Sequence, residues 1–277
     1  MRTALYNPYT FKGGIMSQLR ILCIGDVVGP LAVAFLERRL WQLRTSLRVD
    51  FTVLNAENAA PGDGTDPQTA RALFAAGADV LTGGNHTFQK RSLYAYLEQE
   101  RRILRPANYP PDCPGSGYTI ETIQGLRLLC INVNGTVFMQ NLACPFRTVS
   151  QILQREDGKY DLALLDIHAE ATSEKIALGQ YFDGRIQVIY GTHTHVPTAD
   201  EQILPHGSGY ITDVGMTGPE HHSVLGVKTE CVIDFLTKKM PRRFEPADGP
   251  LTLRAALFTV DTQTRRTVQL ERITVEE

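Results

Sequence analysis

Strand-length apolar runs alternate with amphipathic runs along most of the chain. The apolar runs are bounded by glycine or polar residues, as buried strands are, and the amphipathic runs repeat apolar residues at the 3.6-residue spacing of a helix. Residues 105–117 are rich in proline and glycine and predict a loop. The pattern predicts strands at residues 19–25, 51–56, 79–83, 117–123, 126–135, 160–168, 186–191 and 209–215, a terminal hairpin within 251–276, and helices at 31–47, 66–77, 89–101, 148–155 and 171–182.

Local signals support these boundaries and indicate the fold class. Asp66 is predicted to cap the helix that begins with Pro67, and Gly77 is predicted to end it. Near-continuous apolar strands that alternate with helices are typical of a predominantly parallel sheet covered on both faces. The two hairpins indicate antiparallel edges. The sequence therefore predicts an α/β fold.

Polar side chains directly follow five of the predicted strands. In open α/β sheets, ligands bind in the crevice beyond the carboxyl ends of the strands, so these side chains are expected to converge. Four of the seven histidines stand at such positions. The residues at the five strand ends are Asp26, Glu57 with Asn58, Asn85 with His86, His168, and His193 with His195.

Each of these positions has an ordinary explanation when it is taken alone. Asp26 by itself fits a helix cap best, and the run "GGNHTF" fits a tight turn. His168 by itself fits a hydrogen-bonded core histidine. The pair His193 and His195 in "GTHTH" fits a shared centre better, because residues i and i+2 lie on one face of an extended segment. Such side chains are unlikely to stand at five strand ends by chance, so together they favour a common site.

The number and chemistry of these donors suggest a dinuclear metal site. Without His86, the strand ends supply Asp26, Glu57, Asn58, Asn85, His168, His193 and His195. One octahedral ion takes about six ligands and must leave positions for water and substrate, so this set fits two ions that share a bridge. Glu57 is the better bridging candidate because its side chain is longer than that of Asp26. Oxygen and imidazole donors without thiolate favour Fe²⁺, Mn²⁺ or Zn²⁺.

Composition restricts the possible partners. The 277 residues include 43% apolar and 21% charged residues, which is ordinary for a globular protein. The net charge is −2 and the pI is near 6.4, so no basic surface for duplex nucleic acid or an anionic membrane is expected. No apolar run approaches the roughly 20 residues that span a bilayer. A small phosphate-bearing substrate is compatible with this charge, since a metal ion supplies positive charge locally.

The cysteines and the N-terminal residues indicate the compartment of the protein and the boundaries of its domain. The five cysteines, an odd number with no C-x-x-C pair, predict reduced thiols and a cytoplasmic protein. Residues 1–15 lack the apolar core of a secretory signal and precede Met16, after which the first strand follows closely. We predict an N-terminal extension over residues 1–15, a natural translation start at Met16, and a single domain over residues 16–277.

The strand-end motifs together resemble those of the calcineurin-like metallophosphoesterases, whose series is GD, GNH, H and GHxH. The sequences of these motifs resemble those of the YmdB-like branch of that superfamily, over about residues 19–235. Two departures from the wider superfamily, Val28 in place of a histidine and Glu57 in place of the bridging aspartate, are typical of this branch. The motifs that carry the resemblance are "GDVVG", "AENAAPGDG", "GGNHTF", "DIHAEATSEK", "GTHTHVPTAD" and "TDVGMTGP".

The resemblance implies a metallophosphoesterase sandwich of mixed, mainly parallel sheets flanked by helices. It also implies two divalent ions per chain, with Fe²⁺ or Mn²⁺ expected ahead of Zn²⁺, and it is compatible with a homo-oligomer. Thr194 is expected to point away from the ions, toward packing or a supporting hydrogen bond. The implied ligands are Asp26, Glu57, Asn58 and His195 for the first ion, and Glu57, Asn85, His168 and His193 for the second.

The activity implied by the resemblance is phosphodiester hydrolysis, with 2′,3′-cyclic nucleotides as the favoured substrates. A metal-activated hydroxide would attack phosphorus, and His86 would act as general acid beside the substrate. Two alternatives stay open: a phosphomonoesterase of the same fold, and a regulatory or RNA-associated scaffold with incidental hydrolysis. The second has little support, because all the ligand candidates are present and no basic stripe appears.

Overall fold

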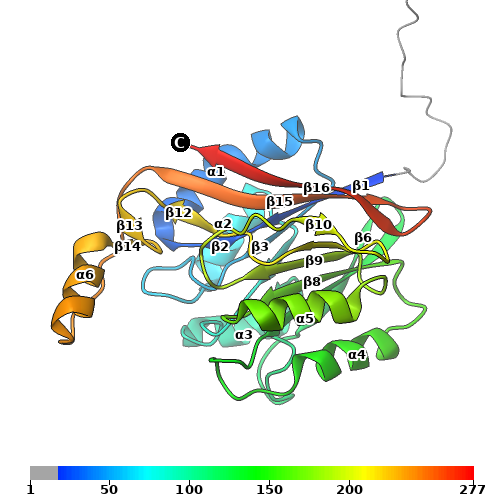
Figure 1. Cartoon of the computed structure of the whole chain (residues 1–277), viewed down its shortest axis with the longest axis horizontal. Coiled ribbons are helices and arrows are strands. Elements are labelled where there is room, and N and C mark those ends of the chain that lie inside the picture. Colours follow the sequence, from blue (N-terminus) through cyan, green and yellow to red (C-terminus); the bar gives the residue numbers. More distant parts are fainter. Residues whose placement is uncertain (1–17) are drawn as a thin grey trace, which may run out of the picture.

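The computed structural model describes residues 18–277 and contains two sheets that pack face to face (Figure 1). Strands β1, β3, β4 and β5 of the first sheet are parallel, and the long β15 pairs antiparallel to β1. The first sheet has, in spatial order, β2 (Asp26–Val27), β12 (Met216–Pro219), β15 (Leu251–Asp261), β1 (Gln18–Ile24), β3 (Phe51–Asn55), β4 (Val80–Thr82) and β5 (Ile103–Leu104), with β16 (Arg266–Glu276) paired to β15.

The second sheet is also parallel at its centre and antiparallel at its edges. Strands β7, β8, β9 and β11 run parallel, whereas β6 and β10 run antiparallel to their neighbours. A separate hairpin joins β13 (Ser223–Val224) to β14 (Val227–Lys228). In spatial order the second sheet has β10 (Gln202–Ile203), β11 (Gly209–Ile211), β9 (Val188–Thr192), β8 (Leu162–His168), β7 (Leu126–Asn134) and β6 (Tyr118–Ile123).

Helices cover only the outer face of each sheet. Between the sheets, an apolar layer joins residues such as Cys23, Val53, Leu164 and Tyr190. Figure 1 shows α1 on one side of the two sheets, and α4 and α5 on the other. The helices are α1 (Gly29–Ser46), α2 (Pro67–Ala76), α3 (Arg91–Gln99), α4 (Pro145–Arg155), α5 (Thr172–Phe182) and α6 (Thr229–Lys238).

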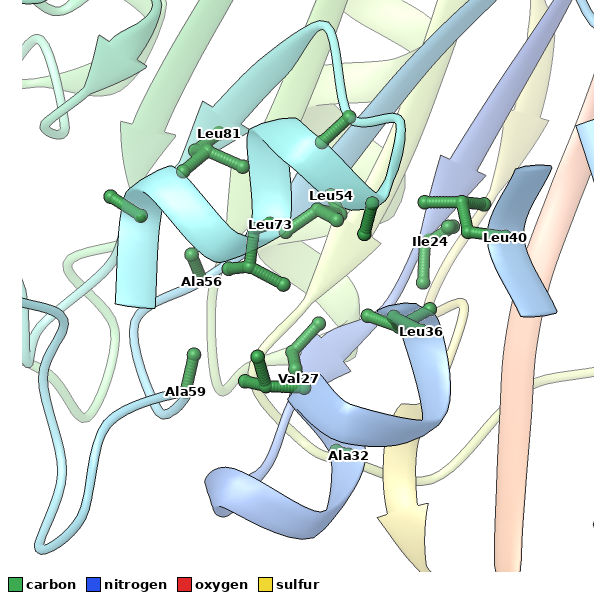
Figure 2. Close-up of a cluster of buried hydrophobic side chains, with 14 of the residues drawn as sticks. Ile24, Val27, Ala32, Leu36, Leu40, Leu54, Ala56, Ala59, Leu73 and Leu81 are labelled. Carbon is green, nitrogen blue, oxygen red and sulfur yellow. The ribbon is translucent and has the colours of Figure 1, made fainter. Parts of the chain in front are cut away.

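The packing of α1 and α2 fixes the ends of the strands beneath them. Leu36 and Leu40 of α1 and Leu73 of α2 are fully buried in one cluster with Ile24 of β1 and Leu54 of β3 (Figure 2). Burial of a Leu or Ile side chain contributes roughly 1.5–3 kcal/mol, so this cluster holds the strands in a fixed position relative to the helices. The polar residues that follow β1 and β3 are therefore presented from a rigid frame.

Most predicted elements are confirmed. The Asp66 carboxylate accepts a hydrogen bond from the Thr69 amide at 2.8 Å, and Gly77 ends α2 with a φ of 117°, as predicted. All five cysteines are free thiols. Each sheet is covered on both faces, as expected, but the two covers differ: helices pack on one face and the other sheet packs on the second. Helix α6 was not predicted, and Figure 1 shows it projecting from the body of the molecule.

Two further sequence predictions concern the ends and surroundings of the chain. The predicted extension over residues 1–15 and the start at Met16 lie outside the described residues, and the single domain from residue 16 stays a prediction. Within residues 18–277, no helix combines the length and the apolar character that a membrane crossing requires.

Candidate metal centre

The residues predicted from the five strand ends converge between the two sheets. His168 ends β8, and its Nε2 atom lies 3.0 Å from Asn85 Oδ1, 3.1 Å from Glu57 Oε1 and 3.1 Å from His193 Nδ1. Asn85 follows β4 and Glu57 follows β3, so the first sheet supplies two of these four donors and the second sheet the other two. These are the four residues expected to hold the second ion.

The other expected donors gather around Asp26, which lies in β2 just after β1. His195 Nε2 lies 3.7 Å from Asp26 Oδ1 and 3.3 Å from Asn58 Nδ2. Asn58 Nδ2 in turn lies 3.4 Å from Glu57 Oε1, which joins the two groups, whereas Asn58 Oδ1, the atom of this amide that can bind an ion, contacts His86 Nδ1 at 2.7 Å. Asp26 does not cap α1, whose cap residue Val28 makes no side-chain hydrogen bond, so the simpler explanation of Asp26 is wrong.

Three observations indicate that this donor set fits metal ions. The Asp26 Oδ1 atom is buried and has no hydrogen-bond partner within residues 18–277. The donors around His168 Nε2 are 3.0–3.1 Å from it, and neighbouring donors of an octahedral ion with bonds of about 2.1 Å lie about 3 Å apart. A Cβ atom at Gly84 would lie 2.2 Å from Glu57 Oε2 and 2.3 Å from His168 Nε2, so only glycine leaves this space open.

The hydrogen bonds of the three histidines leave the inward nitrogen of each ring free to act as a ligand. His195 Nδ1 lies 3.2 Å from the Leu225 carbonyl oxygen, which can only accept, so the neutral ring keeps its lone pair on Nε2. His193 Nε2 lies 3.1 Å from the Glu170 carboxylate, which by the same argument leaves the lone pair on Nδ1. Partners of this kind orient ligand imidazoles and fix their tautomers.

His168 is oriented by a buried polar chain. Its Nδ1 atom lies 2.9 Å from the Thr192 hydroxyl, which donates to Asp166 Oδ1 at 2.8 Å. The Thr192 oxygen therefore accepts from Nδ1, and Nε2 faces the other donors. Asp166 also accepts from the Thr82 hydroxyl, and burial raises the pKa of this carboxyl to about 7. These hydrogen-bonded side chains belong to β8, β9 and β4, so they link both sheets behind the metal centre.

The charges of the cluster are strongly coupled. Burial lowers the pKa of His168, but the carboxylates of Glu57, Asp26 and Asp166 together outweigh this effect and raise the pKa above its ordinary value. The His168 cation correspondingly holds the pKa of Glu57 below its ordinary value, although burial opposes it. Burial and the His168 charge lower the pKa of His193 to about 3. A metal cation would replace the proton on His168, because an imidazole ligand must be neutral.

The "GTHTH" turn places its two histidines on different sides of the cluster. His193 and His195 have φ angles of 98° and 63°, so the expectation of an extended segment is wrong. Left-handed backbone at residues other than glycine costs about 1–3 kcal/mol and persists where the surroundings enforce it. His193 is held by a bond from its amide to Asp26 Oδ2 at 3.0 Å. Its ring faces His168, whereas that of His195 faces Asp26.

Thr194 points away from the cluster, as predicted, and ties the turn to a buried ion pair. Its hydroxyl donates to Asp213 Oδ2 at 2.8 Å, and its amide lies 3.2 Å from the same oxygen. The Lys175 ammonium also contacts this oxygen at 2.6 Å, and both charged side chains are buried. A helix of the outer layer therefore fixes the backbone between the two histidines.

His86 lies at the edge of the cluster. Its Nδ1 atom lies 2.7 Å from Asn58 Oδ1 and 3.5 Å from Glu57 Oε1, and its amide donates to Glu57 Oε2 at 2.9 Å. One third of its side chain is exposed, unlike the fully buried His168. Because the Asn58 amide oxygen accepts from Nδ1, the Nε2 atom is the ring nitrogen that is left for another partner.

Sequence reasoning missed the residues that support the ligands. Asp166 carried a signal, because a carboxylate inside a buried apolar strand needs a polar partner. Asp213 follows β11 and could have been found by the strand-end rule that found the ligands. Lys175, Thr192 and Glu170 carried no signal, since their roles depend on contacts between distant elements.

Two facing sheets with a carboxylate, amide and imidazole cluster at their strand ends define the class of calcineurin-like metallophosphoesterases. Within that class the chain belongs to the YmdB-like family: the family of YmdB-like proteins matches residues 22–273. The expected resemblance and fold class are thus confirmed.

Similar proteins of known sequence or structure span nearly the whole chain. A Bacillus subtilis (strain 168) protein named 2′,3′-cyclic-nucleotide 2′-phosphodiesterase is 40% identical over 259 residues, which are 94% of this chain and 98% of that protein. A crystal structure described as a novel phosphatase of Mycoplasma pneumoniae is 32% identical with a TM-score of 0.89, covering 95% of each chain. A crystal structure of a hypothetical protein from Thermus thermophilus is 39% identical with a TM-score of 0.87, covering 94% of this chain and 100% of that one.

Proposed function

We propose that this chain is a metal-dependent phosphodiesterase that hydrolyses 2′,3′-cyclic nucleotides. The observation that carries the proposal is the donor cluster around His168 Nε2 and Asp26 Oδ1, built from the strand ends of both sheets. The similarity to the Bacillus subtilis phosphodiesterase supports this substrate class. Such a small substrate needs no extended basic surface, and the net charge of −2 agrees with it.

We assign one ion to Asp26, Glu57, Asn58 and His195, and a second to Glu57, Asn85, His168 and His193. Fe²⁺ or Mn²⁺ suits these oxygen and imidazole donors, and Zn²⁺ is the alternative. Two such ions would supply positive charge to the phosphate oxygens and would acidify the attacking water. The carboxylates of Asp26 and Glu57 are buried without a lysine or arginine among the contacts described for them, so their charge is free to hold cations.

The chain's own contribution to the chemistry is to orient the reacting groups and move protons. The attacking water would lose one proton to the solvent, and its oxygen would form a new bond to phosphorus. The bond from phosphorus to one ribose oxygen would break, and that ribose oxygen would take up a proton. As an imidazolium, His86 would give this proton from Nε2 and keep the other on Nδ1, which donates to Asn58 Oδ1 at 2.7 Å. Asn58 and Glu57 thus fix the imidazole ring at the edge of the site, where the leaving oxygen departs.

Replacing His86 by alanine is expected to lower kcat for 2′,3′-cyclic AMP by about 10²- to 10⁴-fold, the usual contribution of a general acid. Metal content should stay at the wild-type level, because His86 lies outside the assigned ligand set. Steady-state kinetics and elemental analysis on the same sample measure both quantities. A variant that loses its metal together with its activity would contradict the assigned role.

The proposed function is tested by elemental analysis and hydrolysis assays on one purified preparation. We expect about two ions per chain, hydrolysis of 2′,3′-cyclic AMP, loss of activity on chelation, and recovery when Mn²⁺ or Fe²⁺ is restored. The linear monoesters 2′-AMP and 3′-AMP serve as comparison substrates. Faster hydrolysis of these monoesters would assign a phosphomonoesterase instead. A folded, metal-supplemented protein that binds no metal would overturn the proposal.

A further inference from the structure

A loop beside the metal centre exposes a phenylalanine side chain to solvent. Residues 135–143 follow β7, and the Gly135 amide donates to the His168 carbonyl at 2.9 Å. Phe138 in this loop is 89% exposed, the largest value among the large apolar side chains of residues 18–277. Its φ of 62° is left-handed, which is unfavourable for a bulky residue. Neither exposure nor backbone conformation favours this arrangement, so other contacts must maintain it.

The two ends of the loop are joined by one buried side chain. The Asn108 amide nitrogen donates to the Asn134 carbonyl at 2.9 Å and to the Ala143 carbonyl at 3.0 Å. Its amide oxygen accepts from the Asn134 backbone at 2.9 Å, and the Ala143 amide donates to the Asn108 carbonyl at 3.2 Å. Asn108 therefore closes the loop at its base.

A buried carboxylate holds the first half of the loop. Glu174 of α5 accepts hydrogen bonds from the Thr136 amide at 2.9 Å and from the Val137 amide at 3.1 Å, and the Thr136 hydroxyl donates to it as well. The carboxylate therefore receives hydrogen bonds from the two residues that precede Phe138. Polar anchors of this kind fix the backbone, because breaking them would leave a buried charge without its hydrogen bonds.

The second half of the loop contacts residues that lie around the metal centre. Met139 Sδ lies 3.3 Å from the Glu170 amide nitrogen, and the Glu170 carboxylate lies 3.1 Å from His193 Nε2. Gln140 accepts from the Tyr109 hydroxyl at 2.7 Å, and the Tyr109 ring packs edge-on against Phe88, two residues after His86. Phe138 is thus one residue from Met139, which contacts Glu170, and two residues from Gln140, which contacts Tyr109, and each residue spans at most about 3.6 Å.

We propose that Phe138 is the platform on which the nucleobase of the substrate stacks. This inference rests on the proposed function, because it concerns the part of a nucleotide that the metal centre does not bind. The rings of the assigned histidine ligands face the cluster and His86 is mostly buried against Asn58, whereas Phe138 is rigidly presented and exposed. Stacking needs only the π-face that every base has, so the subsite accepts any of the four bases. Glu174 and Asn108 act as positioning residues that hold the platform.

The test compares a nucleotide with an ester that has the same cyclic phosphate and no base. For wild-type and Phe138→Ala protein, kcat and KM are measured with 2′,3′-cyclic AMP and with glycerol 1,2-cyclic phosphate. The ratio of kcat/KM between the two esters should fall about 5- to 100-fold in the variant, mainly through KM, as expected from the loss of one stacked base. Phe138→Tyr, which keeps the ring, should retain the wild-type ratio, and Phe138→Leu should not.

A matched control is Tyr181→Ala, which removes a half-exposed aromatic ring at the opposite end of α5. It should leave the ratio unchanged. Equal losses on both esters in Phe138→Ala would show a structural role for the ring, and an unchanged ratio would show that no base stacks there. Either result overturns the inference while the proposed function stands. If the wild-type protein hydrolyses neither ester, the proposed function fails. Base stacking is then tested by the binding of 3′-AMP: tighter binding by wild type than by Phe138→Ala would support stacking on Phe138, and equal binding would overturn it.

Discussion

Replacing Glu57 by glutamine is expected to remove most of the metal and nearly all of the hydrolytic activity. Glu57 Oε1 lies 3.1 Å from His168 Nε2, and Asn58 links the same oxygen to the Asp26 side of the cluster. The carboxylate is thus the one donor placed between both groups. Removing a residue that hydrogen-bonds to a metal ligand typically costs about 10- to 100-fold in metal affinity or activity. Removing a ligand that two ions share should therefore lower kcat/KM by more than about 100-fold.

The glutamine side chain keeps the shape of Glu57 and removes its negative charge, which separates the electrostatic effect from packing. Elemental analysis should find a clear fall from the wild-type metal content, while circular dichroism should find an unchanged fold. Glu37→Gln, at an exposed position of α1, is the matched control and should leave metal content and kcat/KM at wild-type levels. Retention of the full metal content by Glu57→Gln would remove Glu57 from the ligand set.

The strands and helices were predictable because each has a local signal. Strand β8 is an apolar run interrupted only by Asp166 before it ends on His168, and α2 has a cap, a first-turn proline and a final glycine. The pairing of two sheets had no such signal, because an apolar strand face looks the same whether a helix or a second sheet covers it. Helix α6 was missed for a related reason: among its residues only Cys231 is buried, so its apolar side chains do not mark a core-facing stripe.

The convergence of the candidate metal ligands was predictable because the ends of parallel strands meet at one edge, which makes sequence order a guide to position. The rule needs no knowledge of which strands are neighbours. The orientation of His193 and His195 was not predictable, because it depends on a left-handed turn that Asp26 and the Lys175–Asp213 pair enforce. Nor could the sequence alone show that the loop containing Phe138 borders the cluster.

Replacing Lys175 by methionine is expected to lower the free energy of unfolding by about 3–5 kcal/mol, the usual effect of removing one partner of a buried ion pair. The Lys175 ammonium contacts Asp213 Oδ2 at 2.6 Å, and Asp213 would be left buried with only neutral partners. Methionine fills a similar volume, so the change isolates the charge. Urea unfolding of the chelated proteins, monitored by circular dichroism, measures the difference without a contribution from bound metal.

The surface pair Lys228 and Glu245 provides the control, because both side chains of its 3.0 Å contact are open to solvent and Lys228→Met should change the free energy of unfolding by less than about 1 kcal/mol. The double variant Lys175→Met with Asp213→Asn should recover part of the lost stability, since no unpaired charge is then buried. It should still bind metal more weakly than wild type, because the Asp213 oxygen that holds Thr194 between the two histidines is altered. Equal stability losses in the single and double variants would mean that Lys175 stabilises the fold by packing, and the ion pair would then have no part in holding the metal-binding turn.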